Sequence, residues 1–272
     1  MSRTCALSVA FGAITAAAVG RWVWISRVNN GPQGREHGPH EPLPVVYVAG
    51  SWQPEWLAQR AANSLRRRGF DVYPCTLHDP ERPRTLVTRT VRDISEKLPA
   101  FVDEVLTKTG ASQVDVVAYS LGGLVVRYWL KEFGGAEVVR TAVLLSGVVQ
   151  GSPVEQWLEE RGWLPTGDSV SEVARGGDEI KGLNTPQEAV EGVRYVCITT
   201  RYEIDAAPYE INFLSGPGEY DNILIQDQLP GEPILHQGLD QLSGVWAGVA
   251  DALRGRPVNF QSVLPWRRKW CG

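Results

Sequence analysis

Hydrophobic positions along the chain follow two alternating patterns. Short apolar runs rich in β-branched residues predict buried strands at 44–50, 70–75, 114–118, 140–147, 193–199 and 222–226. Between these runs, apolar residues recur at helical spacing and predict helices over 55–70, over about 85–109 with a break at Pro99, after residue 120, and over 239–253. Because strands alternate with helices, we expect an α/β fold with a mainly parallel sheet covered by helices on both faces.

The N-terminal segment, residues 1–27, differs from the rest of the chain. The apolar stretch "CALSVAFGAITAAAVG" contains Ala16 and Ala18 in an A-x-A arrangement, which predicts a signal peptide cleaved after Ala18 or shortly later. Extended through "RWVWIS", the stretch reaches about 22 mostly apolar residues broken by Arg21, which is also long enough for an uncleaved membrane anchor. Both alternatives predict export, with the protein secreted or anchored facing outside.

Composition shifts predict three further segments. Residues 28–43 are rich in Gly, Pro and polar residues and predict a linker, residues 44–256 form the folded domain, and residues 257–272 form a tail. The tail ends in "WRRKWCG", where Trp266 and Trp270 surround three cations. This composition suits a membrane interface, and it also suits a solvated tail.

Charge and cysteine content narrow the functional classes. The net charge is −4 and the pI is near 5.7, whereas nucleic-acid-binding domains are typically basic, so no nucleic-acid partner is expected. The four cysteines are widely spread and match no metal-site spacing, and no phosphate-binding loop is present. We therefore predict neither a metal nor another cofactor.

Ser120 is the candidate nucleophile. In "VVAYSLGGLVVRYWL" it falls between a predicted strand that ends at Ala118 and a helix that begins at Leu121. A nucleophile elbow needs small residues two positions before and after the serine, and Ala118 and Gly122 meet that demand. An ordinary turn with two loop glycines is the alternative interpretation of this A-x-S-x-G string.

His236 is the candidate general base. A serine hydroxyl needs a histidine, and of the four in this chain His37 and His40 lie in the predicted linker while His78 precedes the nucleophile. His236, in "PILHQGLDQL", follows a late strand and is expected to open the last helix. This position matches the order Ser, acid, His of α/β-hydrolases.

The candidate acids and oxyanion donors lie in loops after strands. Glu203 and Asp205, in "TTRYEIDAAP", both stand where the triad acid is expected, and one of them orients His236. The oxyanion hole requires two backbone N–H groups. One belongs to Leu121, and Ser51, in the loop "AGSWQ" after the first strand, is the expected second donor.

From about residue 44 to residue 253, the chain resembles the bacterial class 2 lipases, which are small α/β-hydrolases. Three stretches carry the resemblance: "EVLTKTGASQVDVVAYSLGG", "GLNTPQEAVEGVRYVCITTRYE" and "NILIQDQLPGEPILHQGL". The resemblance implies an α/β-hydrolase fold and hydrolysis of carboxylic, acylglycerol-type esters through an acyl-enzyme. In that reaction Ser120 attacks, His236 transfers the proton, and Ser51 and Leu121 hold the oxyanion.

Two positions depart from the family pattern. Ala49 replaces the histidine of the usual H-G pair before the oxyanion residue. The family acid is an aspartate five residues before a proline, and counting back from Pro208 reaches Glu203, so the resemblance favours Glu203. A local shift of the loop would place Asp205 there instead.

Two other functions fit the same sequence. An acyltransferase would use the same triad and pass the acyl group to an alcohol other than water, whereas a non-catalytic binding domain would retain only the fold. Four apolar residues in the irregular segment after the fourth strand could rim an acyl pocket, form a small lid or pack in the core: Trp157, Leu158, Trp163 and Leu164.

Overall fold

The computed structural model describes residues 43–51, 53–77, 90–163 and 171–262. The predicted N-terminal segment at 1–27, residues 28–42 of the linker and residues 263–272 of the tail lie outside this part of the chain. So do His37, His40, His78 and Leu164.

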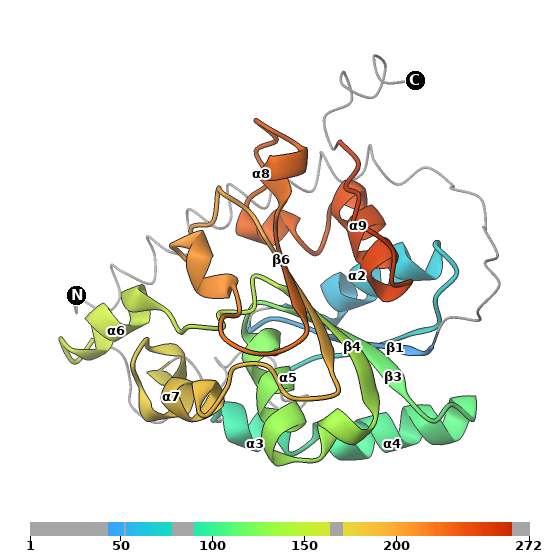
Figure 1. The fold of residues 1–272 in the computed structure, drawn as a ribbon, viewed down its shortest axis with the longest axis horizontal. Helices are drawn as coiled ribbons and strands as arrows, with labels where there is room; N and C mark the ends of the chain where they lie inside the picture. Colours follow the sequence, from blue (N-terminus) through green and yellow to red (C-terminus); the bar gives the residue numbers. More distant parts are fainter. Residues whose placement is uncertain (1–42, 52, 78–89, 164–170, 263–272) are drawn as a thin grey trace.

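Six parallel strands form one sheet in the order β2-β1-β3-β4-β5-β6 (Figure 1). The strands are β1 (Val45–Val48), β2 (Val72–Cys75), β3 (Val114–Tyr119), β4 (Val139–Leu145), β5 (Arg194–Thr199) and β6 (Tyr220–Leu224). The α/β fold expected from the alternating patterns is confirmed, and the strand order is that of an open sheet whose connections run over both faces.

Helices cover both faces of the sheet. On one face lie α3 (Val91–Ser95), α4 (Leu98–Thr109) and α5 (Leu121–Glu132), and on the other lie α2 (Glu55–Arg66) and α9 (Ser243–Leu253) (Figure 1). Other helices occupy the connections after β4, before β5 and after β6: α6 (Pro153–Glu159), α7 (Asp178–Asn184) and α8 (Ile225–Gln228). Short 3₁₀ turns follow the same connections: η1 (Gly135–Glu137), η2 (Ser171–Val173), η3 (Tyr209–Asn212) and η4 (His236–Gly238).

Successive strand residues are divided between two hydrophobic cores. Val46 and Val48 pack toward α3, α4 and α5, whereas Val45 and Tyr47 pack toward α2 and α9. A strand that places every second side chain on the same face and is buried on both faces reads as a continuous apolar run. The runs found in the sequence have this origin.

Several predicted elements end differently in the structure: the helix predicted over 55–70 ends at Arg66, and the strand predicted over 140–147 ends at Leu145. The run at 222–226 predicts a strand to its end, but β6 stops at Leu224 and Ile225 begins α8. His236 was expected to open the last helix, but it lies in η4, and α9 begins only at Ser243. The apolar residues that recur at helical spacing from Leu239 onward are all buried in the core between the sheet and helices α2 and α9. The turn before α9 keeps them on that face of the sheet.

The predicted break near Pro99 is present between α3 and α4. Pro99 lies in the first turn of α4, where its missing N–H would have no partner within the helix. After α9 the chain remains packed on the domain, because Phe260 is buried in the core beneath α2 and α9 and its N–H donates to Gln228 Oε1.

The strand order determines where a site can form. β1 and β3 are neighbours although β2 separates them in sequence, so the chain leaves β1 toward one edge of the sheet and leaves β3 toward the other. A crevice opens at the carboxyl ends of strands where the order reverses in this way. The loop that follows β1 and Ser120 at the end of β3 therefore meet.

Candidate active site

Ser120 occupies a strained turn between β3 and α5. Its backbone has φ +54° and ψ −128°, in the left-handed region that side chains other than glycine rarely adopt. The Ser120 N–H donates to the carbonyl of Leu145 at 2.9 Å, and its own carbonyl accepts from the Gly123 N–H at 2.8 Å. Bonds to β4 and to α5 thus hold the strained conformation in place.

The glycines after Ser120 allow α5 to approach the sheet closely. A Cβ on Gly122 would lie 2.7 Å from the carbonyl oxygens of Val48 and Ala49, and a Cβ on Gly123 would lie 2.5 Å from the Cα of Gly147. Neither position has room for a side chain. The start of α5 therefore sits directly on the ends of β1 and β4, which is the packing that a nucleophile elbow needs.

The structure brings Ser120, His236 and Glu203 into one hydrogen-bonded chain. His236 Nε2 lies 3.0 Å from Ser120 Oγ, and His236 Nδ1 lies 2.8 Å from Glu203 Oε2. The three residues come from the end of β3, from η4 and from the loop after β5. His236 and Glu203 are both buried.

The two candidate acids have different contacts. Glu203 Oε1 accepts the backbone N–H groups of Ile204, Asp205 and Ala206 at 3.0, 3.0 and 3.1 Å, while its other oxygen faces His236. The carboxylate of Asp205 instead accepts from Gln237 Nε2. Asp205 is therefore a neighbouring charge and not the partner of the imidazole.

The environment separates the pKa values of the acid and the base. Burial alone would raise the pKa of Glu203, but the charge of His236 and hydrogen bonds from His236, Ser146 and Ala206 lower it to about 2. Burial alone would lower the pKa of His236, but the charge of Glu203, the hydrogen bond to it and the nearby charges of Asp205 and Asp240 raise it. Glu203 is thus ionised at neutral pH.

Leu121 and Ser51, the two residues expected to donate to an oxyanion, lie at the start of α5 and in the turn after β1. Leu121 is the first residue of α5, so its N–H has no acceptor within the helix. Ser51 follows Gly50 in the turn after β1. A Cβ on Gly50 would lie 3.1 Å from Ser120 Cβ, which shows how closely this turn approaches Ser120.

Polar residues that the sequence patterns did not single out hold the acid loop. Gln226 Oε1 accepts the N–H of Arg201 at 2.7 Å, and its amide nitrogen donates to Thr200 Oγ1 at 2.9 Å. Asn212 Nδ2 donates to the carbonyl of Ala206 at 3.0 Å. Gln226 lies in the four-residue helix α8 and Asn212 in the short turn η3, and segments this short show no periodicity that could have singled them out.

Glu203, Asp205 and His236 also form a group whose ligand atoms lie within 4.8 Å of one another. A metal ion there would have to replace the bond from His236 Nδ1 to Glu203 and the bond from Gln237 to Asp205. Both oxygens of Glu203 already accept hydrogen bonds, and Gln237 donates to one oxygen of Asp205. The donor set therefore fits a hydrogen-bonded triad better than a metal site.

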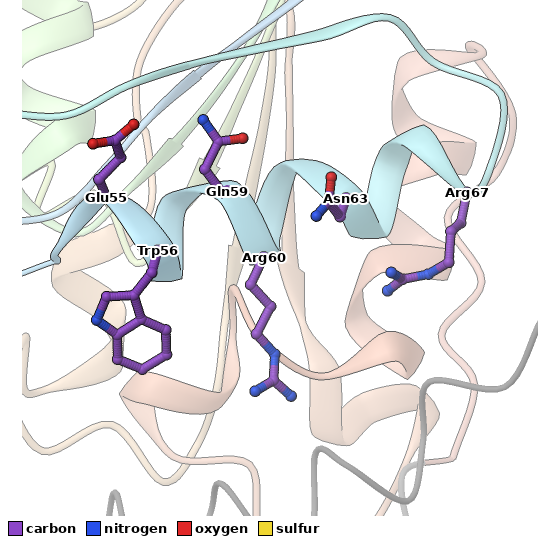
Figure 2. Close-up of a pocket in the computed structure, with 6 residues that line it drawn as sticks. All are labelled: Glu55, Trp56, Gln59, Arg60, Asn63 and Arg67. Carbon is purple, nitrogen blue, oxygen red and sulfur yellow. The ribbon is translucent and has the colours of Figure 1, made fainter.

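Two of the four apolar residues considered for an acyl pocket are exposed. Trp157 in α6 and Trp163 stack edge to face at 5.3 Å between ring centroids and remain 44% and 51% exposed. Leu158 is half-buried. A surface hollow of about 620 Å³ lies elsewhere, and Figure 2 shows the side chains along α2 that line it: Glu55, Trp56, Gln59, Arg60, Asn63 and Arg67. It contains no member of the hydrogen-bonded chain.

Within the described ranges, no helix combines the length and the apolar character needed to cross a membrane.

Comparison with known proteins agrees with the resemblance noted in the sequence. Residues 42–152 match the sequence model of class 2 lipases. Lipase B of Aspergillus fumigatus has a similar structure, with a TM-score of 0.65 and 18% identity over 87% of this chain. This chain spans 58% of the length of that lipase.

Two further structures share the fold. A gene product of Listeria innocua matches with a TM-score of 0.51 and 14% identity, over 77% of this chain and 93% of that one. A structure of the metagenome-derived lipolytic enzymes LipS and LipT matches with a TM-score of 0.50 and 13% identity, over 68% and 83%. The predicted similarity to class 2 lipases and the predicted α/β-hydrolase fold are therefore confirmed.

Gly123→Ala should destabilise the protein, because the new Cβ would collide with the backbone of Gly147. We expect the free energy of unfolding in urea to fall by about 1–3 kcal/mol, the usual cost of overpacking a rigid site. Gly182→Ala in α7 is the matched control, since a Cβ at that helical glycine meets nothing within 4 Å. Equal stability of the two variants would contradict the close crossing.

Proposed function

We propose that this chain, whose residues 42–152 match class 2 lipases, hydrolyses carboxylic esters of the acylglycerol type through an acyl-enzyme. The chain of hydrogen bonds from Ser120 Oγ to His236 and on to Glu203 is the observation that carries this proposal. It connects a nucleophile, a base and an orienting acid in the arrangement that acyl transfer requires.

In the first half of the reaction, Ser120 Oγ bonds to the carbonyl carbon of the ester while His236 Nε2 accepts the hydroxyl proton. The tetrahedral intermediate collapses, the bond to the alcohol oxygen breaks, and His236 returns the proton to the departing alcohol. In the second half, His236 takes a proton from a water molecule, and the oxygen of that water attacks the carbonyl carbon of the acyl-enzyme. Breaking the acyl bond releases the carboxylic acid, and Ser120 regains its proton.

Glu203 has an orienting role in this proposal. Its carboxylate accepts the Nδ1 proton of His236, which leaves Nε2 free to accept the proton of Ser120. Because three backbone N–H groups hold the other oxygen of Glu203, the carboxylate stays in place when the imidazole becomes charged. The ionised Glu203 then stabilises that charge.

The negative charge that develops on the carbonyl oxygen is assigned to the backbone N–H groups of Ser51 and Leu121. Both lie beside Ser120, one at the turn after β1 and the other at the start of α5. Donors fixed by the backbone stabilise the transition state without having to reorganise.

Ser120→Ala should abolish hydrolysis of p-nitrophenyl esters from acetate to palmitate. We expect kcat to fall by a factor on the order of 10⁶, because the acyl-enzyme cannot form. Ser64→Ala, at a buried serine in α2, is the control and should keep wild-type turnover. A folded wild type that neither turns over these esters nor reacts with a fluorophosphonate would favour the binding-domain alternative, and transfer to an added alcohol would favour the acyltransferase.

Glu203→Gln and Asp205→Asn separate the two candidate acids. Glu203→Gln removes the charge that faces His236 Nδ1, and we expect kcat to fall by about 10⁴-fold. Asp205→Asn should lower kcat by less than about tenfold, because its carboxylate bonds Gln237 instead. The steady-state rates of both variants on p-nitrophenyl butyrate decide the matter, and a larger loss in Asp205→Asn would reverse the assignment.

The pH dependence of kcat/KM should follow His236. The base acts when it is neutral, and the charge of Glu203 raises its pKa above the ordinary value despite burial. Activity is therefore expected to fall as the pH falls through this raised pKa, with the acid limb of the profile above about pH 6.5. In Glu203→Gln the residual activity should show this acid limb at lower pH. Without the charge of Glu203, burial lowers the pKa of His236. An unchanged limb would mean that another group titrates.

A further inference from the structure

A buried polar cluster lies directly beneath the turn that carries Ser51. It consists of Tyr47 from β1, Gln53 from the loop after β1, and Asp240 from the segment between η4 and α9, all three buried. The Tyr47 hydroxyl lies 2.7 Å from Asp240 Oδ2, and Gln53 Nε2 donates to the same oxygen. The proposed reaction assigns none of the three a role, although the charge of Asp240 contributes to the raised pKa of His236.

Gln53 connects this cluster to the backbone of the turn. The side-chain Oε1 of Gln53 accepts the backbone N–H of Gly50 at 3.2 Å. The backbone N–H of Gln53 donates to the carbonyl of Gly50 at 3.3 Å. The side-chain amide thus spans from the backbone next to Ser51 to the carboxylate of Asp240.

The charge of Asp240 determines which way round the amide lies. An ionised carboxylate only accepts hydrogen bonds, so the NH₂ group of Gln53 must face it and the amide oxygen must face Gly50. Burial raises the pKa of Asp240 to about 6, although hydrogen bonds from Tyr47, Gln241 and Gln53 favour the charged form. At pH 8 the carboxylate is ionised and this orientation is enforced.

Asp240 is itself held in place by Gln241 and by Trp246 of α9. Its backbone carbonyl accepts from Trp246 Nε1 at 2.8 Å, and Gln241 Nε2 donates to its carboxylate at 3.0 Å. The Tyr119 ring lies 5.0 Å from the ring of His236, and a Cβ on Gly50 would lie 3.0 Å from Tyr119 Cδ1. The turn, the nucleophile and the base are therefore packed as one unit.

We propose that Asp240, acting through Gln53, is a positioning residue that aims the backbone N–H of Ser51 at the oxyanion. The inference rests on the proposed function, because it assigns these residues to the same ester-cleaving site. Neither residue touches the substrate. They fix the Gly50 backbone, and the position of the next N–H in the chain follows from it.

The test compares an ester with its thiono analogue at pH 8. Sulfur is a weaker hydrogen-bond acceptor than oxygen, so p-nitrophenyl thionobutyrate gains less from the oxyanion donors than p-nitrophenyl butyrate does. For Asp240→Asn we expect kcat on the oxygen ester to fall roughly 10–100-fold with little change in KM. The thionoester should lose much less, so the ratio of the two rates should fall about tenfold.

Two further variants guard against a merely structural effect. Asp115→Asn removes another buried carboxylate, at the opposite end of β3, where Asp115 pairs with Arg140. It should lower the free energy of unfolding and leave the rate ratio unchanged. If Asp240→Asn does not fold, Gln53→Met carries the same test, because methionine keeps the shape and removes both amide contacts.

The outcomes are distinct. Equal losses on both substrates, or an unchanged rate on the oxygen ester, would overturn the positioning role while leaving the proposed function intact. A wild type that cleaves neither substrate and does not take up a fluorophosphonate at Ser120 would overturn the proposed function, and this inference with it. A selective loss on the oxygen ester supports the inference.

Discussion

The close crossing of α5 over the carboxyl ends of β1 and β4 is the constraint on which the site depends. Gly122 and Gly123 have no room for a side chain, so the helix rests on the backbone of two strands. This contact forces Ser120 into a left-handed conformation and turns its hydroxyl out of the sheet toward His236. The same contact brings the turn after β1 against Ser120.

The buried pair of Glu203 and His236 is a second constraint, and it is electrostatic. A carboxylate and an imidazole out of water each lose solvation, which is recovered only when every lone pair and proton has a partner. The backbone of the acid loop provides three N–H groups for one oxygen of Glu203, and His236 satisfies the other. The loop conformation and the ionised state of Glu203 therefore support each other.

Further buried polar groups lie at the carboxyl ends of the strands, and each bonds to the backbone of a loop. Gln226 and Asn212 hold the acid loop, and Gln53 with Asp240 holds the turn after β1. Loops lack the regular hydrogen bonds of helices and strands, so their buried backbone groups need side-chain partners. These bonds hold the loops at the carboxyl ends of the strands, while the two hydrophobic cores hold the helices on the sheet.

The sequence by itself determined the α/β architecture, because hydrophobic periodicity is a local property of the chain. It also singled out Ser120 from the small residues around it and His236 from its place in the chain order. It left Glu203 and Asp205 open, since both stand in one loop two residues apart. Only the tertiary structure decided that Glu203 faces the imidazole, through the N–H groups that fold around its carboxylate. Asp240 and Gln53 lie 187 residues apart in the chain and meet only because β1 packs against the segment before α9, so no local pattern could have paired them.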